Sequence, residues 1–153
     1  MNRYVAIICI PLLLIIGLTV GCVENRGKEV HEVTFDQLCA NPDHYNGKHV
    51  TIEGFYFHGF EVVVLSERLE YSAYAKGHLT PEGRMAWIEG EIPREVYDQL
   101  YQQTMMGPEE RYGKVKLTGE FQYGGKYGHL GAYNSQIIPM EVVLLQWSPP
   151  TQQ

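Results

Sequence analysis

The sequence has little positive charge. It contains 12 Lys and Arg against 18 Asp and Glu, which gives a formal net charge of −6. Arg3 is the only charged residue among the first 21. The net charge of the chain without residues 1–21 is therefore −7. An acidic surface repels phosphate backbones, and we therefore expect no binding of nucleic acid.

The sequence also lacks the motifs of common catalytic and nucleotide-binding sites. It contains no G-x-S-x-G nucleophile motif, no H-E-x-x-H zinc motif and no glycine-rich loop ending in G-K-S or G-K-T. Its six histidines are scattered, and no two have the spacing of metal ligands on a helix. We therefore expect no catalysis, no cofactor and no metal. The alternative is a metal-dependent or enzymatic protein whose site is assembled from loops that include His58 and His129.

A long apolar run stands at the start of the chain. Arg3 provides a short basic segment, and residues 4–20 are almost uninterruptedly apolar, which is typical of an export signal. The run ends in Leu18-Thr19-Val20-Gly21-Cys22, which resembles the lipobox of bacterial lipoproteins. The resemblance implies that residues 1–21 are a cleaved signal peptide and that the thiol of Cys22 receives lipid.

The lipid would hold the protein at the outer face of the cell membrane, or at the outer membrane if the organism has two membranes. The alternative is an uncleaved transmembrane anchor, since about 17 apolar residues can just span a bilayer. Residues 22–32 are polar with little periodicity, and we expect them to be a tether. One domain would follow over residues 33–148, and residues 149–153 would form a tail, because 153 residues leave no room for a second domain.

Few cysteines remain for that domain. Cys9 lies in the apolar run and Cys22 carries the lipid, so Cys39 stands alone and no intramolecular disulfide can form. A small exported domain without disulfides depends on its apolar core. We expect Cys39 to be a small buried residue of a short helix, with a reactive thiol as the alternative.

Two helices are predicted. Thr34 and Gln37 form a capping box, so a helix begins there, and it ends before Pro42 because the residue before a proline avoids helical geometry. A second helix has Pro93 in its first turn, carries a stripe of apolar and aromatic side chains over residues 96–101 and ends before Gly107-Pro108.

The rest of the domain is predicted to be extended. Gly54 indicates a bulge in the first strand, His58-Gly59 a two-residue turn, and Pro139 an edge or a bulge in the last strand. Residues 66–84 are polar and are predicted to form a long loop. The predicted strands cover residues 49–57, 60–65, 85–88, 114–123 and 136–147.

Three strands, a helix and two strands follow one another in this order, which resembles the OB-fold, a small five-stranded barrel with a helix between strands 3 and 4. The stretch from Leu38 to Gly54, L-C-A-N-P-D-H-Y-N-G-K-H-V-T-I-E-G, is similar to the opening of a group of uncharacterised bacterial exported OB-like domains. The resemblance implies a mainly β fold with minor helix, and it implies no reaction. Other small barrels of sandwich or SH3-like type are the alternative.

A glycine-rich segment over residues 124–131 is the candidate binding loop. In OB-folds the loop between the last two strands flanks the binding face, and glycines let backbone amides approach a ligand closely. A flexible hairpin loop is the alternative. The candidate binding residues are His58, Lys126, Tyr127, His129 and Tyr133.

The sequence contains 11 tyrosines, most of them in its second half. Aromatic rings with polar tips suit sugar stacking and protein interfaces, and they equally suit the edge of a small core. We expect a membrane-anchored, non-catalytic module that presents its loops to a protein or glycan partner in the cell envelope.

Overall fold

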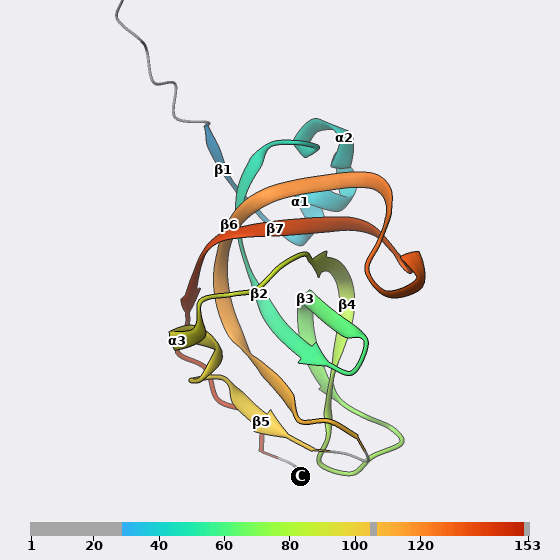
Figure 1. The fold of residues 1–153 in the computed structure, drawn as a ribbon, viewed down its shortest axis with the longest axis vertical. Coiled ribbons are helices and arrows are strands. Elements are labelled where there is room, and N and C mark those ends of the chain that lie inside the picture. Colours follow the sequence, from blue (N-terminus) through green and yellow to red (C-terminus); the bar gives the residue numbers. More distant parts are fainter. Residues whose placement is uncertain (1–28, 105–106, 152–153) are drawn as a thin grey trace, which may run out of the picture.

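A computed structural model describes residues 29–104 and 107–151 and shows a mainly β protein with few helices, as predicted (Figure 1). The predicted signal peptide, the lipid site Cys22 and most of the predicted tether lie outside the described residues. The strands are β1 (Val30–Val33), β2 (His49–Gly59), β3 (Val62–Tyr71), β4 (Leu79–Ile88), β5 (Tyr101–Gln103), β6 (Glu110–Tyr127) and β7 (Tyr133–Leu144). The helices are α1 (Phe35–Ala40), α2 (Pro42–Tyr45), α3 (Arg94–Tyr97) and the short 3-10 helix η1 (His129–Gly131).

All seven strands belong to one sheet, in the order β1-β2-β3-β4-β7-β6-β5. Because β2 also pairs with β6, the pairings β2–β3, β3–β4, β4–β7, β7–β6 and β6–β2 return to the strand from which they began. The β1–β2 and β4–β7 pairs are parallel, and the others are antiparallel. The five long strands thus form a cycle, and the short strands β1 and β5 are added to it.

Two apolar clusters stabilise this arrangement. The larger one joins the five long strands to α1 and α3, and the smaller one is built around Phe57, Val64 and Leu79. Neighbouring residues of a strand point to opposite faces, and Tyr56 belongs to the first cluster whereas Phe57 belongs to the second. The two clusters therefore lie on opposite faces of β2.

The alternation predicted for residues 114–123 is confirmed in β6. Val115, Leu117 and Phe121 are buried, while Lys114 and Lys116 are only partly buried and reach carboxylates on other strands. A half-buried strand needs such an alternation, since its side chains alternate between core and solvent.

The boundaries predicted for the first helix are also confirmed. The Thr34 hydroxyl accepts a hydrogen bond from the backbone N–H of Gln37 (3.2 Å), and the Gln37 side chain accepts one from the Thr34 N–H (2.8 Å). The helix ends at Ala40, and Pro42 begins the separate helix α2.

The prediction that Cys39 is buried is wrong. α1 turns Phe35 and Leu38 towards the core, and Cys39, the residue after Leu38, lies on the exposed face as a free thiol. A helix of only six residues at the surface of a domain buries one stripe of side chains.

Ordered structure begins earlier than the tether prediction placed it. Val30–Val33 forms β1, which pairs in parallel with residues 49–52 of β2. β3 pairs with β2 only from Phe55 onward, so the backbone of residues 49–52 has an open side. β1 forms hydrogen bonds with these backbone groups. The sequence of β1 has no apolar periodicity, so it gives no sign of this pairing.

The predicted turn at His58-Gly59 is wrong by two residues. Both residues belong to β2 and pair with β3, as His58 with Val63 and Gly59 with Val62. The chain turns instead at Phe60-Glu61.

No bulge occurs at Gly54, because the pairing of β2 with β6 runs through it without a shift. A Cβ atom there would lie 2.9 Å from both the Leu65 side chain and the Ser66 carbonyl oxygen. Glycine is required at this position for close packing between β2 and β3 rather than for a bend.

Residues 66–84 are not a loop. β3 extends to Tyr71 and β4 begins at Leu79, so only the short connection between them is irregular. The predicted helix after Pro93 is likewise shorter than expected: α3 ends at Tyr97, and Tyr101 begins β5 instead.

Pro139 lies beside a bulge, as predicted. The β6–β7 register shifts between Thr118 and Gly119, the residue opposite Pro139. After β7 the chain continues along the sheet, where the Trp147 ring packs edge-on against Phe55 with centroids 5.1 Å apart.

Candidate functional site

The structure separates the predicted binding residues into two groups. Lys126 and Tyr127 end β6, His129 lies in η1, and Tyr133 begins β7, so these four belong to one hairpin end. His58 lies near the end of β2 and lines a cavity to which none of the other four residues contributes.

The hairpin end meets the turn between β2 and β3. The Nε2 atom of His129 lies 3.3 Å from Oε2 of Glu61, which joins two turns that are far apart in the sequence. Both turns lie on the same side of the molecule (Figure 1). We call Phe60, Glu61, His129 and Leu130 the turn surface.

The backbone of the turn surface is unusual. Glu61 has a φ of 59° and Leu130 a φ of 53°, and over residues 29–104 and 107–151 they are the only non-glycine residues with positive φ. Such a conformation is uncommon for a leucine, and it persists only where surrounding structure imposes it. Residues held in this way cluster at functional sites, so the two turns are candidates for one.

Both turns present apolar side chains to solvent. Phe60 is 67% exposed and Leu130 is 91% exposed. Exposing two large apolar side chains on adjoining turns brings no stability to an isolated domain, whereas covering them with a partner would be favourable.

An aromatic pair holds the second turn in place. The rings of Trp87 and Tyr133 have centroids 5.5 Å apart, and a Cβ atom on Gly128 would come within 2.5 Å of the Trp87 ring. Gly128 therefore lets the backbone of the turn lie directly on Trp87. Burial in this contact raises the pKa of the Tyr133 hydroxyl, which stays neutral.

His58 and His129 have different partners. The Nδ1 atom of His58 lies 2.8 Å from the Tyr97 hydroxyl oxygen, whereas His129 pairs with Glu61. Within the part of the chain that the structure describes, no group of three or more His, Cys, Asp or Glu is arranged to hold a metal ion.

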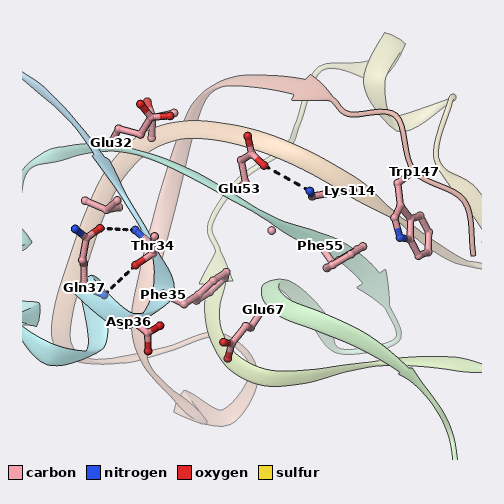
Figure 2. Close-up of a pocket in the computed structure, with 13 residues that line it drawn as sticks. Glu32, Thr34, Phe35, Asp36, Gln37, Glu53, Phe55, Glu67, Lys114 and Trp147 are labelled. Carbon is pink, nitrogen blue, oxygen red and sulfur yellow. Dashed lines mark hydrogen bonds and ion pairs between the residues drawn. The ribbon is translucent and has the colours of Figure 1, made fainter. Parts of the chain in front are cut away.

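A hollow larger than the cavity lined by His58 lies beside the end of β1 (Figure 2). It has a volume of about 650 Å³, and Phe35, Phe55 and Trp147 form its apolar part. Its four carboxylates all have basic partners. The pairs are Glu32–Lys116 (2.8 Å), Glu53–Lys114 (3.5 Å), Glu67–Arg84 (3.7 Å) and Asp36–Arg84.

These ion pairs tie β1 and α1 to the long strands. The hydrogen bond from Lys116 lowers the pKa of Glu32, so this carboxylate is ionised and paired with Lys116. The charges of the hollow thus serve the fold, and we place the candidate site at the turn surface.

Sequence reasoning found one half of the turn surface and missed the other. The glycines over residues 124–131 indicate the hairpin end, but the sequence predicts Phe60 at the start of a strand and gives no reason to select Leu130. No local signal places a turn at Phe60-Glu61, because neither residue type is typical of a tight turn and Glu61 adopts a positive φ there.

We compared the chain with models of protein families, with curated proteins and with solved structures, and none of them matched. None of the helices within residues 29–104 and 107–151 has the length and apolar character needed to cross a membrane.

Proposed function

We propose that this chain is an exported lipoprotein, anchored by lipid on Cys22, whose OB-like barrel binds a protein partner in the cell envelope through the turn surface, without catalysis. The anchor rests on the basic start, the apolar run and the lipobox-like residues 18–22.

The cycle of strand pairings supports an OB-like barrel. In chain order β2, β3, β4, β6 and β7 would be its five strands, with the third and fifth paired in parallel. In OB-folds the loops between strands 1 and 2 and between strands 4 and 5 flank the binding face. Those two loops are the turns that carry Phe60 and Leu130.

The observation that carries the proposal is the contact between the two turns. Glu61 and His129 lie in contact across the two turns, and the backbone at Glu61 and Leu130 adopts a conformation that costs free energy. Phe60 and Leu130 are thereby presented on adjoining turns. Rigid apolar anchors surrounded by polar groups are typical of the energetically important centre of protein interfaces.

Site-specific photo-crosslinking in intact cells tests the proposal. A photoreactive phenylalanine analogue in place of Phe60 should give one discrete adduct, identified by mass spectrometry. The matched control is the same analogue in place of Tyr74, which is fully exposed on the β3–β4 connection. Phe60→Ser or Leu130→Asn should weaken binding of the identified partner at least about tenfold, because each removes an apolar anchor.

Leu130→Asn is chosen because asparagine tolerates positive φ and the turn should keep its shape. Adducts of equal yield from both positions, or a partner that binds both variants as well as the wild-type protein, would contradict the proposal.

A further inference from the structure

A cavity of about 450 Å³ lies between β2, β3 and the segment that leads into α3. We call it the His58 cavity. Tyr56, Val63 and Ile92 form its inner part, and His58 and Tyr97 lie beside them. It is distinct from the turn surface, with which it shares no lining residue.

The hydroxyl of Tyr56 has no partner among the residues that the structure describes. Tyr56 is only 3% exposed, and none of the residues that the structure describes forms a hydrogen bond with its hydroxyl. Among the described residues no fully sealed side-chain N or O atom lacks a hydrogen bond, so the Tyr56 hydroxyl must reach open space. The open space that Tyr56 lines is the His58 cavity.

An unpaired phenol inside a cavity favours a ligand that can bond to it. Burial raises the pKa of Tyr56 far above its usual value, so the hydroxyl keeps its proton and can donate. A purely apolar ligand would seal this group away from water without a hydrogen bond, which costs free energy.

Two further neutral groups converge beside Tyr56. The Nδ1 atom of His58 is bonded to the Tyr97 hydroxyl (2.8 Å), which fixes the imidazole ring. The other ring nitrogen of His58 has no partner among residues 29–104 and 107–151. Burial lowers the pKa of His58, so the ring is neutral at neutral pH.

The charges at the rim do not favour an ionic ligand. Arg94 lies at the rim with its guanidinium 3.6 Å from the carboxylate of Asp98, so its charge is partly compensated. Glu91 also lines the rim and would repel an anion. The guanidinium of Arg111 lies 5.3 Å from the centre of the Tyr97 ring, which makes that ring less attractive to a second cation.

We propose that the His58 cavity binds a neutral sugar residue. Neutral hydroxyl groups would complete the hydrogen bonds of Tyr56 and His58, and the apolar face of the sugar ring would lie on Val63 and Ile92. The sugar is either free or the end of a glycan chain.

Methyl NMR of the full chain, purified in a detergent without a sugar headgroup, tests this inference. The probes are glucose, galactose and N-acetylglucosamine, with glucuronate and glucosamine as charged counterparts. At least one neutral sugar should shift the methyl signals of Val63 and Ile92 and leave the exposed Val143 unchanged. Binding of the corresponding methyl glycoside would identify the end of a glycan chain, and its failure would identify the free sugar.

Tyr56→Phe is the decisive variant, since it removes only the unpaired hydroxyl. It should weaken sugar binding about five-fold, the cost of one neutral hydrogen bond, without lowering thermal stability. Tyr45→Phe makes the same chemical change in α2, outside the cavity, and should leave binding unchanged. Shifts caused only by the charged compounds, no shifts with any neutral sugar, or equal binding by Tyr56→Phe would overturn the proposal.

Discussion

His58 shows how burial alone changes the behaviour of a residue. Its ring lies against Tyr97, and burial lowers its pKa below the ordinary value of histidine. The unfolded chain therefore binds a proton at His58 more readily than the folded chain does. Acid should favour unfolding through this group.

We predict that His58 makes the free energy of unfolding fall as the pH drops below about 6.5, where the unfolded histidine begins to take up its proton. The loss should level off once the pH lies below the lowered pKa of the folded form. His58→Gln should remove this part of the pH dependence, and urea unfolding of both proteins at a series of pH values measures it.

At alkaline pH both proteins carry no charge at position 58, so their stability curves should run parallel. Identical slopes below pH 6.5, or a wild-type protein that gains stability relative to the variant in acid, would show that burial does not suppress protonation of this ring.

At the scale of elements, the short strand β5 depends on one side chain. The Gln103 side chain accepts a hydrogen bond from the Leu79 N–H (3.0 Å) and donates to the Leu79 carbonyl (2.6 Å), so it extends the backbone ladder to β4. It also donates to Glu110 (2.8 Å), which in turn lies 2.8 Å from the ring of the buried His78. Gln103 thus joins β4, β5 and β6.

Gln103→Ala should lower the free energy of unfolding by about 2–4 kcal/mol, because it leaves the buried N–H and C=O of Leu79 without partners. Chemical denaturation measures the loss, and amide exchange at Leu79 should rise. Gln146→Ala, an exposed glutamine after β7, is the control and should change the stability by less than about 0.5 kcal/mol. Equal stability of the two variants would show that β5 is held by other contacts.

The elements predicted correctly are those whose signal is local. The capping box of Thr34 and Gln37 is complete within four residues, and the β6 alternation around Val115 and Leu117 reports the sheet face directly. The bulge beside Pro139 is also predicted correctly, because a proline has no N–H to donate and is therefore confined to edges and bulges in any sheet.

The elements that were missed depend on partners far away in the sequence. Residues 66–84 are polar because the outer ends of β3 and β4 carry charges that pair across the two strands, such as Glu67 of β3 with Arg84 of β4. Leu69 and Leu79 still reach the second apolar cluster. Tyr101 fitted a helical stripe, but its ring stacks on Tyr112 of β6 (5.9 Å), and this contact accompanies a strand.

The candidate site could be predicted only in part for the same reason. Glycine content indicated the hairpin that carries His129, whereas its contact with Glu61 is tertiary and leaves no local pattern. The His58 cavity that Tyr56 lines is likewise built from segments far apart in the sequence, β2, β3 and the residues around α3.

At the scale of the whole molecule, the proposed anchor restricts where the domain can act. Eight peptide steps separate Cys22 from Val30, the first residue of β1, and they span at most about 28 Å when fully extended. β1 begins at one end of the long axis, and the C-terminal end of the chain lies at the other (Figure 1). The domain would therefore stand close to the membrane with β1 nearest to it, and the turn surface would face sideways to neighbouring envelope proteins.

Cys22→Ala tests this placement. Without the thiol there is no acceptor for lipid, so the variant should incorporate no radiolabelled palmitate and should remain as a larger, unprocessed precursor on a denaturing gel. Cys39→Ala is the matched control, because Cys39 is an exposed cysteine that lies within α1 of the folded domain. It should be labelled and processed like the wild-type protein. If the Cys22→Ala protein is still labelled and matures to the same size, the anchor lies elsewhere, and the orientation of the turn surface relative to the membrane loses its basis.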